Sequence, residues 1–236
     1  MVGSLVGALA GLALAPVLRG AVVRYAVPSE QDPLCKACPA CARGVGALAP
    51  TGRCPGCGGR LGPGAGQVEL VAAGAAAAAL STGWPQVLPL LWAVPFGVVL
   101  GFVDGSVRRL PDPLTLCLRL GVALLLVPAA LLDGGPGVLL RCLLVALAAG
   151  ALFEVPAWFG LAGLGDGKLA FGLGALLGLY GWGTAFSAFF LASALGAVWG
   201  TGRMGAALLR RRPVRGLEIP FGPFMLLGTL WAVLLA

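Results

Sequence analysis

Residues 67–103 read QVELVAAGAAAAALSTGWPQVLPLLWAVPFGVVLGFV and contain a single charged side chain, Glu69. One continuous helix of this length would measure about 55 Å, which exceeds the roughly 30 Å hydrocarbon core of a bilayer. The sequence Ser81-Thr82-Gly83-Trp84-Pro85 supplies a turn in the middle. The stretch therefore predicts two consecutive membrane-spanning helices, at about 68–82 and 86–103.

The rest of the chain has a similar composition. Of its 236 residues, 59% are hydrophobic and 11% are charged, whereas a soluble domain carries about a quarter charged residues. We therefore expect an all-α polytopic membrane protein rather than a soluble domain. Counting the two helices above, about eight transmembrane helices are predicted, with the others at 2–18, 114–132, 138–159, two crossings within 168–200 separated near 181–184, and 221–236.

The chain divides into three parts along the sequence. Residues 1–24 form a first transmembrane helix, which we expect to be retained because it lacks the basic start of a signal peptide. Residues 25–66 form a polar loop rich in Pro, Gly and Cys, and residues 67–236 form a seven-helix membrane domain. The 39 glycines suit close helix–helix contact in lipid, although a compositionally biased genome would also produce them.

The net charge of +7 does not indicate nucleic-acid binding, because the basic residues are divided among several short loops. With the N-terminus outside, the segments 19–66, 104–113, 160–168 and 201–220 all face the cytoplasm. They hold 14 of the 16 basic residues, as the positive-inside rule expects. The charge pattern predicts a multi-pass plasma-membrane protein with both termini outside.

Two aspartates stand out in this apolar chain. Asp104 follows the third predicted span and Asp166 precedes the sixth, so both fall at the cytoplasmic face. Ionisable groups at a membrane are functional candidates, and two carboxylates that meet could share a proton for aspartyl chemistry. The alternatives are a helix N-cap for Asp166 and a loop charge paired with Arg108 or Arg109 for Asp104.

The loop at 25–66 contains a pair of Cys-x2-Cys motifs. Cys38, Cys41, Cys54 and Cys57 have the spacing of a tetrahedral zinc site, and a Gly-rich loop without its own core gains stability from a metal. Cys35 also makes a Cys-x2-Cys with Cys38, but the form Cys-Pro-x-Cys repeats in the other two pairs. We therefore predict structural Zn²⁺ on those four cysteines, with redox-active thiols as the alternative.

Several motifs together resemble the type IV prepilin peptidase family of Gly-x-Gly-Asp intramembrane aspartyl proteases. They occur in family order along nearly the whole chain: Arg24-Tyr25-Ala26-Val27-Pro28, Gln67-Val68-Glu69-Leu70, Asp104 followed by Arg109-Leu110-Pro111-Asp112-Pro113-Leu114-Thr115, Gly163-Leu164-Gly165-Asp166-Gly167-Lys168-Leu169, and Ile219-Pro220-Phe221-Gly222-Pro223-Phe224. The family also carries a tetracysteine loop between its first two spans, usually with a longer insert between the Cys pairs.

The resemblance implies an aspartic endopeptidase that removes the basic leader of prepilins or pseudopilins at the cytoplasmic membrane face. Asp104 and Asp166 occupy its catalytic positions, whereas Asp112 matches a position that is often Asn and suits a helix cap. Family members with the cysteine loop often also N-methylate the new terminus with S-adenosylmethionine, which no motif here indicates independently. The partners implied are prepilins and the bilayer; the oligomeric state is left open.

The sequence also allows two alternatives to a prepilin peptidase. A preflagellin-type peptidase is the nearest enzyme, but such peptidases usually lack the cysteine loop. A non-enzymatic ion or proton carrier, or a pilus-assembly scaffold, would also place acidic residues at span ends. The inverted repeat typical of many carriers is not evident in the sequence.

Overall fold

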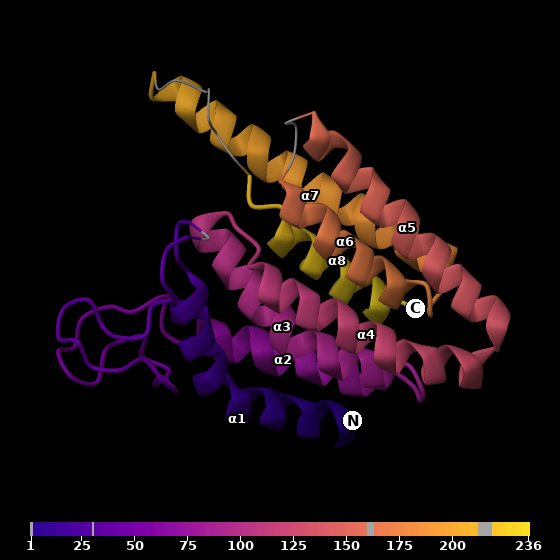
Figure 1. The fold of residues 1–236 in the computed structure, drawn as a ribbon, viewed down its shortest axis with the longest axis horizontal. Helices are drawn as coiled ribbons and strands as arrows, with labels where there is room; N and C mark the ends of the chain where they lie inside the picture. Colours follow the sequence, from indigo (N-terminus) through magenta and orange to yellow (C-terminus); the bar gives the residue numbers. More distant parts are fainter. Residues whose placement is uncertain (1, 30, 160–162, 212–218) are drawn as a thin grey trace.

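The computed structural model describes residues 2–29, 31–159, 163–211 and 219–236. Within these ranges the fold is all-helical, as predicted, and contains eight helices (Figure 1). Their bounds are α1 Val2–Tyr25, α2 Gln67–Ser81, α3 Val87–Val107, α4 Asp112–Asp133, α5 Pro136–Trp158, α6 Leu164–Leu177, α7 Trp182–Leu209 and α8 Gly222–Leu234.

Five of these helices are long and apolar enough to cross a membrane: α1, α3, α4, α5 and α7. Three are shorter: α2 has 15 residues, α6 has 14 and α8 has 13. The expectation of about eight transmembrane helices is thus confirmed for the number of helices, while only five reach spanning length. The apolar stretch 168–200 contains a turn between Leu177, where α6 ends, and Trp182, where α7 begins. The prediction placed this turn slightly later, at 181–184.

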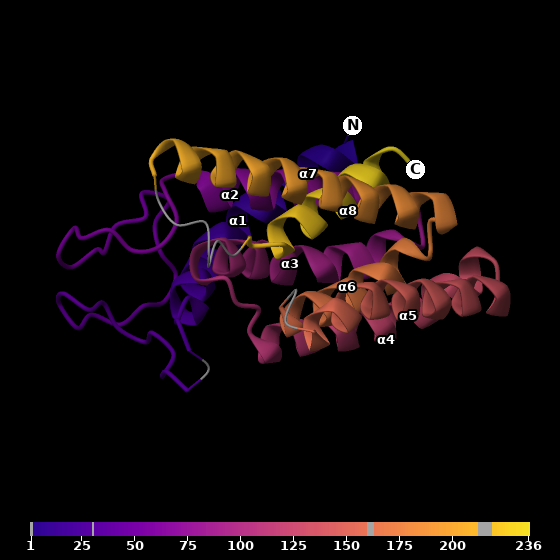
Figure 2. The same cartoon turned by 90° about the horizontal axis from the view of Figure 1, so that it is seen from above.

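The helices pack in two layers around α3. Viewed from above, α4, α5 and α6 lie on one side of α3, and α2, α7 and α8 lie on the other (Figure 2). The main hydrophobic core joins both layers through fully buried residues such as Leu100 of α3, Leu118 of α4 and Leu176 of α6. Many leucines on the outer faces, including Leu124 and Leu152, are exposed, as expected for side chains that face lipid.

Glycines allow the closest helix pairs to approach. On α1, Gly3, Gly7 and Gly11 face the backbone of α2, and a Cβ at Gly3 would lie 2.8 Å from the carbonyl oxygen of Leu80. On α6, Gly174 and Gly178 face α5 in the same way. At these positions the glycines serve close helix packing, one of the two explanations that the composition left open.

The bundle has two distinct ends. The cysteine loop, the end of α3 and the start of α4 lie at one end, whereas both termini lie away from that loop (Figure 1). Basic residues placed in loops by the sequence partly belong to helices: Arg19 and Arg24 lie in α1, Lys168 in α6 and Arg203 in α7. Each lies in the half of its helix nearer the cysteine-loop end, so the charge asymmetry between the two ends is kept.

Candidate active site and metal centre

Asp104 is the more buried of the two predicted site aspartates. It lies in the last turn of α3, which continues past the predicted end of the span to Val107, and it is only 4% exposed. Its carboxylate accepts a 2.9 Å hydrogen bond from the backbone N–H of Gly222, the first residue of α8. That contact requires glycine, because a Cβ at this position would lie 2.9 Å from Asp104 Oδ2.

Asp166 lies in the first turn of α6 and is half-buried. It is not the N-cap residue that the alternative interpretation suggested, since Gly163 holds the N-cap position and accepts the backbone N–H of Asp166 at 3.1 Å. A carboxylate in the first turn interacts favourably with the positive end of the helix dipole. Asp166 is therefore a residue of the first turn of α6 and not its cap.

The two carboxyl groups belong to helices that share neighbours. Both α3 and α6 contact α8 and α4, and in Figure 1 α8 lies between α3 and α6. The start of α6 lies against the segment that follows α3, where a Cβ at Gly165 would lie 2.9 Å from Leu110 Cβ. The fold thus brings together two side chains that are 62 positions apart in the sequence, at the end of the bundle that carries the cysteine loop.

Asp112, the rival aspartate, has a different environment. Its side chain is 54% exposed and forms a 2.6 Å ion pair with Lys168. It is the first residue of α4, with Pro111 in the N-cap position, so the predicted cap role is wrong by one residue. The pair links the start of α4 to the start of α6 and identifies the carboxylate partner of Lys168, which the sequence could not.

Glu154, near the end of α5, forms no ion pair with Lys168, whose described partner is Asp112. Its side chain packs against α6, where a Cβ at Gly167 would overlap it. Glu154, Lys168 and Arg119 line a cavity of about 340 Å³ between α4, α5 and α6. Arg119 lies over the ring of Phe171, with 5.1 Å between its guanidinium carbon and the ring centroid, a distance suited to a cation–π contact.

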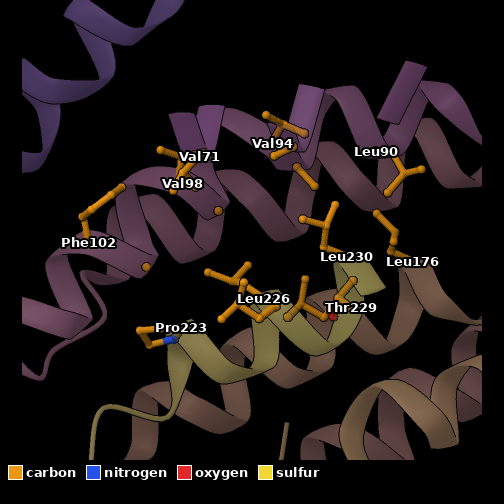
Figure 3. A pocket seen from close by; sticks show the side chains of 16 residues that line it. Val71, Leu90, Val94, Val98, Phe102, Leu176, Pro223, Leu226, Thr229 and Leu230 are labelled. Carbon is orange, nitrogen blue, oxygen red and sulfur yellow. The ribbon is translucent and has the colours of Figure 1, made fainter. Parts of the chain in front are cut away.

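A second cavity, of about 250 Å³, lies next to Asp104 between α3 and α8 (Figure 3). Its lining is apolar except for Thr229. Gly101 and Phe102 line one side and directly precede the last turn of α3, while Pro223 lines the other side next to Gly222.

The four predicted metal ligands meet in one cluster. The Sγ atoms of Cys38, Cys41, Cys54 and Cys57 all lie within 4.8 Å of one another. The distance is 3.7 Å from Cys38 Sγ to Cys57 Sγ and 3.5 Å from Cys41 Sγ to Cys54 Sγ. Sulfurs bound to one tetrahedral ion at about 2.3 Å lie roughly 3.8 Å apart, so this donor set could hold a metal ion.

The backbone around these cysteines forms two matching turns. Cys38 donates its N–H to Arg43 at 2.8 Å, and Cys54 donates its N–H to Gly59 at 2.8 Å. Backbone N–H groups of Cys57 and Gly56 lower the pKa of the Cys54 thiol to about 6, which favours the thiolate that a metal needs. Cys35 lies outside the cluster and hydrogen-bonds to the carbonyl of Ala37. The four clustered cysteines are therefore those of the two Cys-Pro-x-Cys pairs, and Cys35 is not one of them.

A buried ion pair fastens the cysteine loop to the membrane domain. Arg19 of α1, which is fully buried, donates from Nη2 to Glu69 Oε2 of α2 at 2.6 Å and from Nε to Glu69 Oε1 at 3.1 Å. The same guanidinium donates to the carbonyls of Pro63 at 2.8 Å and Gly64 at 3.1 Å. One side chain thus joins α1, α2 and the end of the loop.

Comparison with known families gives one match. Residues 91–201 fit the model of the type IV leader peptidase family. This segment is therefore similar to a type IV leader peptidase domain. The comparisons with curated proteins and with solved structures found no match.

The leader peptidase domain contains Asp104, Asp112 and Asp166 and ends within α7. Gly222 of α8 and the Arg19–Glu69 pair lie outside the matched residues, and sequence reasoning assigned neither of them a role. The sequence identified Ile219-Pro220-Phe221-Gly222 only as a family motif. It could not predict the contact of Gly222 with Asp104, because a hydrogen bond from a backbone N–H to a distant side chain leaves no pattern in the sequence. Arg19 was assigned to a loop because charged residues rarely lie inside an apolar helix.

Proposed function

We propose that this protein is a membrane aspartic endopeptidase that cleaves the basic leader peptide from type IV prepilins or pseudopilins. The observation that carries the proposal is that Asp104, at the end of α3, and Asp166, at the start of α6, lie on two helices that both pack against α4 and α8, within the residues matched by the leader peptidase family. The family provides the substrate class, and the five candidate membrane helices fit a substrate that is itself embedded in the membrane.

The chemistry follows from two interacting carboxyl groups. Like charges at short range do not both ionise readily, so one carboxyl stays protonated beside an ionised partner. The ionised group takes a proton from water as the oxygen attacks the scissile carbonyl, and the protonated group donates a hydrogen bond to the carbonyl oxygen. Collapse of the tetrahedral intermediate breaks the C–N bond, and the amine of the mature protein leaves with a proton from the pair.

The charge distribution supports an active site that faces the cytoplasm. Asp104 and Asp166 lie at the end of the bundle that carries most of the basic residues, including Arg108 and Arg109 directly after α3. By the positive-inside rule this end is cytoplasmic. The basic leader of the substrate then stays in the cytoplasm while the apolar part of the prepilin lies in the membrane.

The cysteine cluster supports a second part of the proposal. Four thiolates with no histidine in the chain suit a closed, structural Zn²⁺ site. Zinc would hold the two turns of the loop together at a distance from the aspartates. Methylation by S-adenosylmethionine rests on the family resemblance alone.

The test is cleavage of a co-expressed prepilin by the wild type and by three single variants, Asp104→Asn, Asp166→Asn and Asp112→Asn. We expect processing by the wild type and by Asp112→Asn, and none by the other two, since each loses an essential titratable carboxyl while keeping nearly the same shape. Immunoblotting of membranes checks equal insertion of all four proteins. The mass of the mature N-terminus shows whether a methyl group is added.

Three outcomes would contradict the proposal in different ways. Processing by all four proteins would remove the two carboxyl groups from the mechanism. Loss of processing in Asp112→Asn with retention in Asp166→Asn would replace one member of the pair. Failure of the wild type with several prepilins would favour the ion carrier or assembly scaffold.

A further inference from the structure

The apolar cavity between α3 and α8 has the composition of a site for a membrane-embedded ligand. Sixteen residues line it, and none of them is charged (Figure 3). The volume of about 250 Å³ is open at one edge, where Val71 and Leu227 are about half exposed, so a ligand in the membrane can reach it. We call this cavity, lined by α2, α3, α6 and α8, the α3–α8 groove.

One end of the α3–α8 groove is lined by residues that are neighbours in sequence of the Asp104–Gly222 contact. On α3, Gly101 lies about one helical turn before Asp104. On α8, Pro223 follows Gly222, whose N–H binds the Asp104 carboxylate. A peptide bond held at Asp104 would therefore have the groove directly beside it, running away from the basic end of the bundle.

Thr229 provides an independent sign of a ligand. Thr229 lines the groove and is 7% exposed, yet its hydroxyl has no hydrogen-bond partner among the described residues. Several helical Thr and Ser residues bond back to their own helix, as Thr115 does to the carbonyl of Asp112 at 3.0 Å, but Thr229 does not. A buried hydroxyl without a partner is costly, so Thr229 is placed to receive a polar group from a molecule in the groove.

We infer that the α3–α8 groove binds one face of the apolar helix that follows the scissile bond of the prepilin. This inference rests on the proposed function. A substrate segment in lipid must be helical, because its backbone groups have no other partners there. Small residues along the groove, Ala75, Ala93 and Gly97, allow such a helix to approach closely.

Thr229 gives the register of the bound helix. It lies seven residues after Gly222 on α8, which corresponds to about 10 Å along the helix axis. A substrate helix alongside α8 would therefore bring a side chain about two turns beyond the scissile bond to Thr229. A hydrogen-bonding side chain at that place in the prepilin would satisfy the Thr229 hydroxyl.

Filling the groove tests the binding of the helix. Ala93→Leu narrows the groove without touching Asp104 or Asp166, and Ala123→Leu makes the same change on an exposed position of α4. Each variant is assayed in detergent with an intact prepilin and with a peptide that ends just after the cleavage site. We expect Ala93→Leu to raise the KM for the prepilin about tenfold or more, which is about 1.4 kcal/mol of lost binding, with kcat and peptide cleavage unchanged.

The possible outcomes distinguish a failure of helix binding by the groove from a failure of the proposed peptidase function. An unchanged KM for the prepilin with Ala93→Leu, or an equal loss with both substrates, would overturn the inference. A loss of co-purifying lipid in Ala93→Leu with unchanged prepilin kinetics would assign the groove to lipid instead. Cleavage of neither substrate by the wild type would instead refute the peptidase function itself.

A double-mutant cycle tests the register. Thr229→Val removes the hydroxyl and keeps the shape of the side chain. We expect it to raise the KM for a prepilin with a polar side chain two turns beyond the scissile bond, and to have no effect once that side chain is replaced by Leu. Additive effects of the two changes would overturn the proposed contact.

Discussion

Gly222 shows how a single hydrogen atom in place of a side chain can determine the geometry of a site. Its N–H is 2.9 Å from the Asp104 carboxylate, and the space that a Cβ would need is already taken by that carboxylate. In a reaction that depends on the placement of two carboxyl groups, a displacement of about 1 Å can reduce the rate about 100-fold. In the proposed reaction Gly222 would therefore act as a positioning residue for Asp104.

At this scale we predict that Gly222→Ala lowers the kcat for prepilin cleavage by about ten- to 100-fold while the protein still inserts into the membrane. The added methyl group would push the Asp104 side chain away from its present position. Gly202→Ala on α7 is the matched control, because a Cβ there meets nothing within 4 Å. Wild-type rates for Gly222→Ala in a purified assay would show that the contact does not position Asp104.

At the scale of elements, the α1–α2 pair connects the cysteine loop to the membrane domain. Gly7 and Gly11 bring the two helix backbones together, and the Arg19–Glu69 pair joins them near the loop. Burying two charges is costly, and the cost is offset here by two hydrogen bonds between the side chains and two to backbone carbonyls. Removal of one partner would leave the other charged and buried.

The Arg19–Glu69 pair leads to a prediction about stability. We expect Glu69→Met to lower the free energy of unfolding by about 3–5 kcal/mol, as for other buried pairs broken on one side. The double variant Arg19→Met/Glu69→Met should be less destabilised than Glu69→Met, because no unpaired charge remains. Thermal unfolding in detergent measures both; a double variant less stable than Glu69→Met would mean that the carbonyl contacts of Arg19 matter more than its charge.

The cysteine loop gives a second prediction at this scale. We expect Cys38→Ser and Cys54→Ser each to lower bound zinc in purified protein, measured by metal analysis, and to make the loop more sensitive to proteolysis. Cys35→Ser should leave the zinc content unchanged, since its thiol lies outside the cluster. Equal zinc in all three variants would disprove the metal site.

At the scale of the whole molecule, hydrophobic patterning predicted the number of helices and most of their limits. The start of α2 and the end of α5 were correct to one residue, because apolar runs end where turn-forming residues begin. The ends of α6 and α8 were predicted a few residues too late, since they lie at Leu177 and Leu234 and an apolar run does not show where a helix ends inside it. Tertiary partners such as Gly222 for Asp104 and Asp112 for Lys168 depend on packing and could not be predicted.

The placement of the termini gives a prediction about topology. Both lie away from the cysteine loop (Figure 1), so with the basic loops in the cytoplasm both should be outside. We expect alkaline phosphatase to be active when fused after Ala236 and inactive when inserted in the cysteine loop. The reverse pattern of activity would invert the topology and place Asp104 and Asp166 on the outer face.

The short helices α6 and α8 have a consequence for how a membrane-embedded bond meets water. They measure about 21 Å and 20 Å, well below the roughly 30 Å of the hydrocarbon core. Their first turns carry Asp166 and Gly222, so a thinner bilayer around these two helices would bring water closer to both residues. A bilayer adapts to short segments by becoming thinner around them. Hydrolysis would then take place in a local depression of the membrane surface, which the aqueous phase reaches without a channel through the protein.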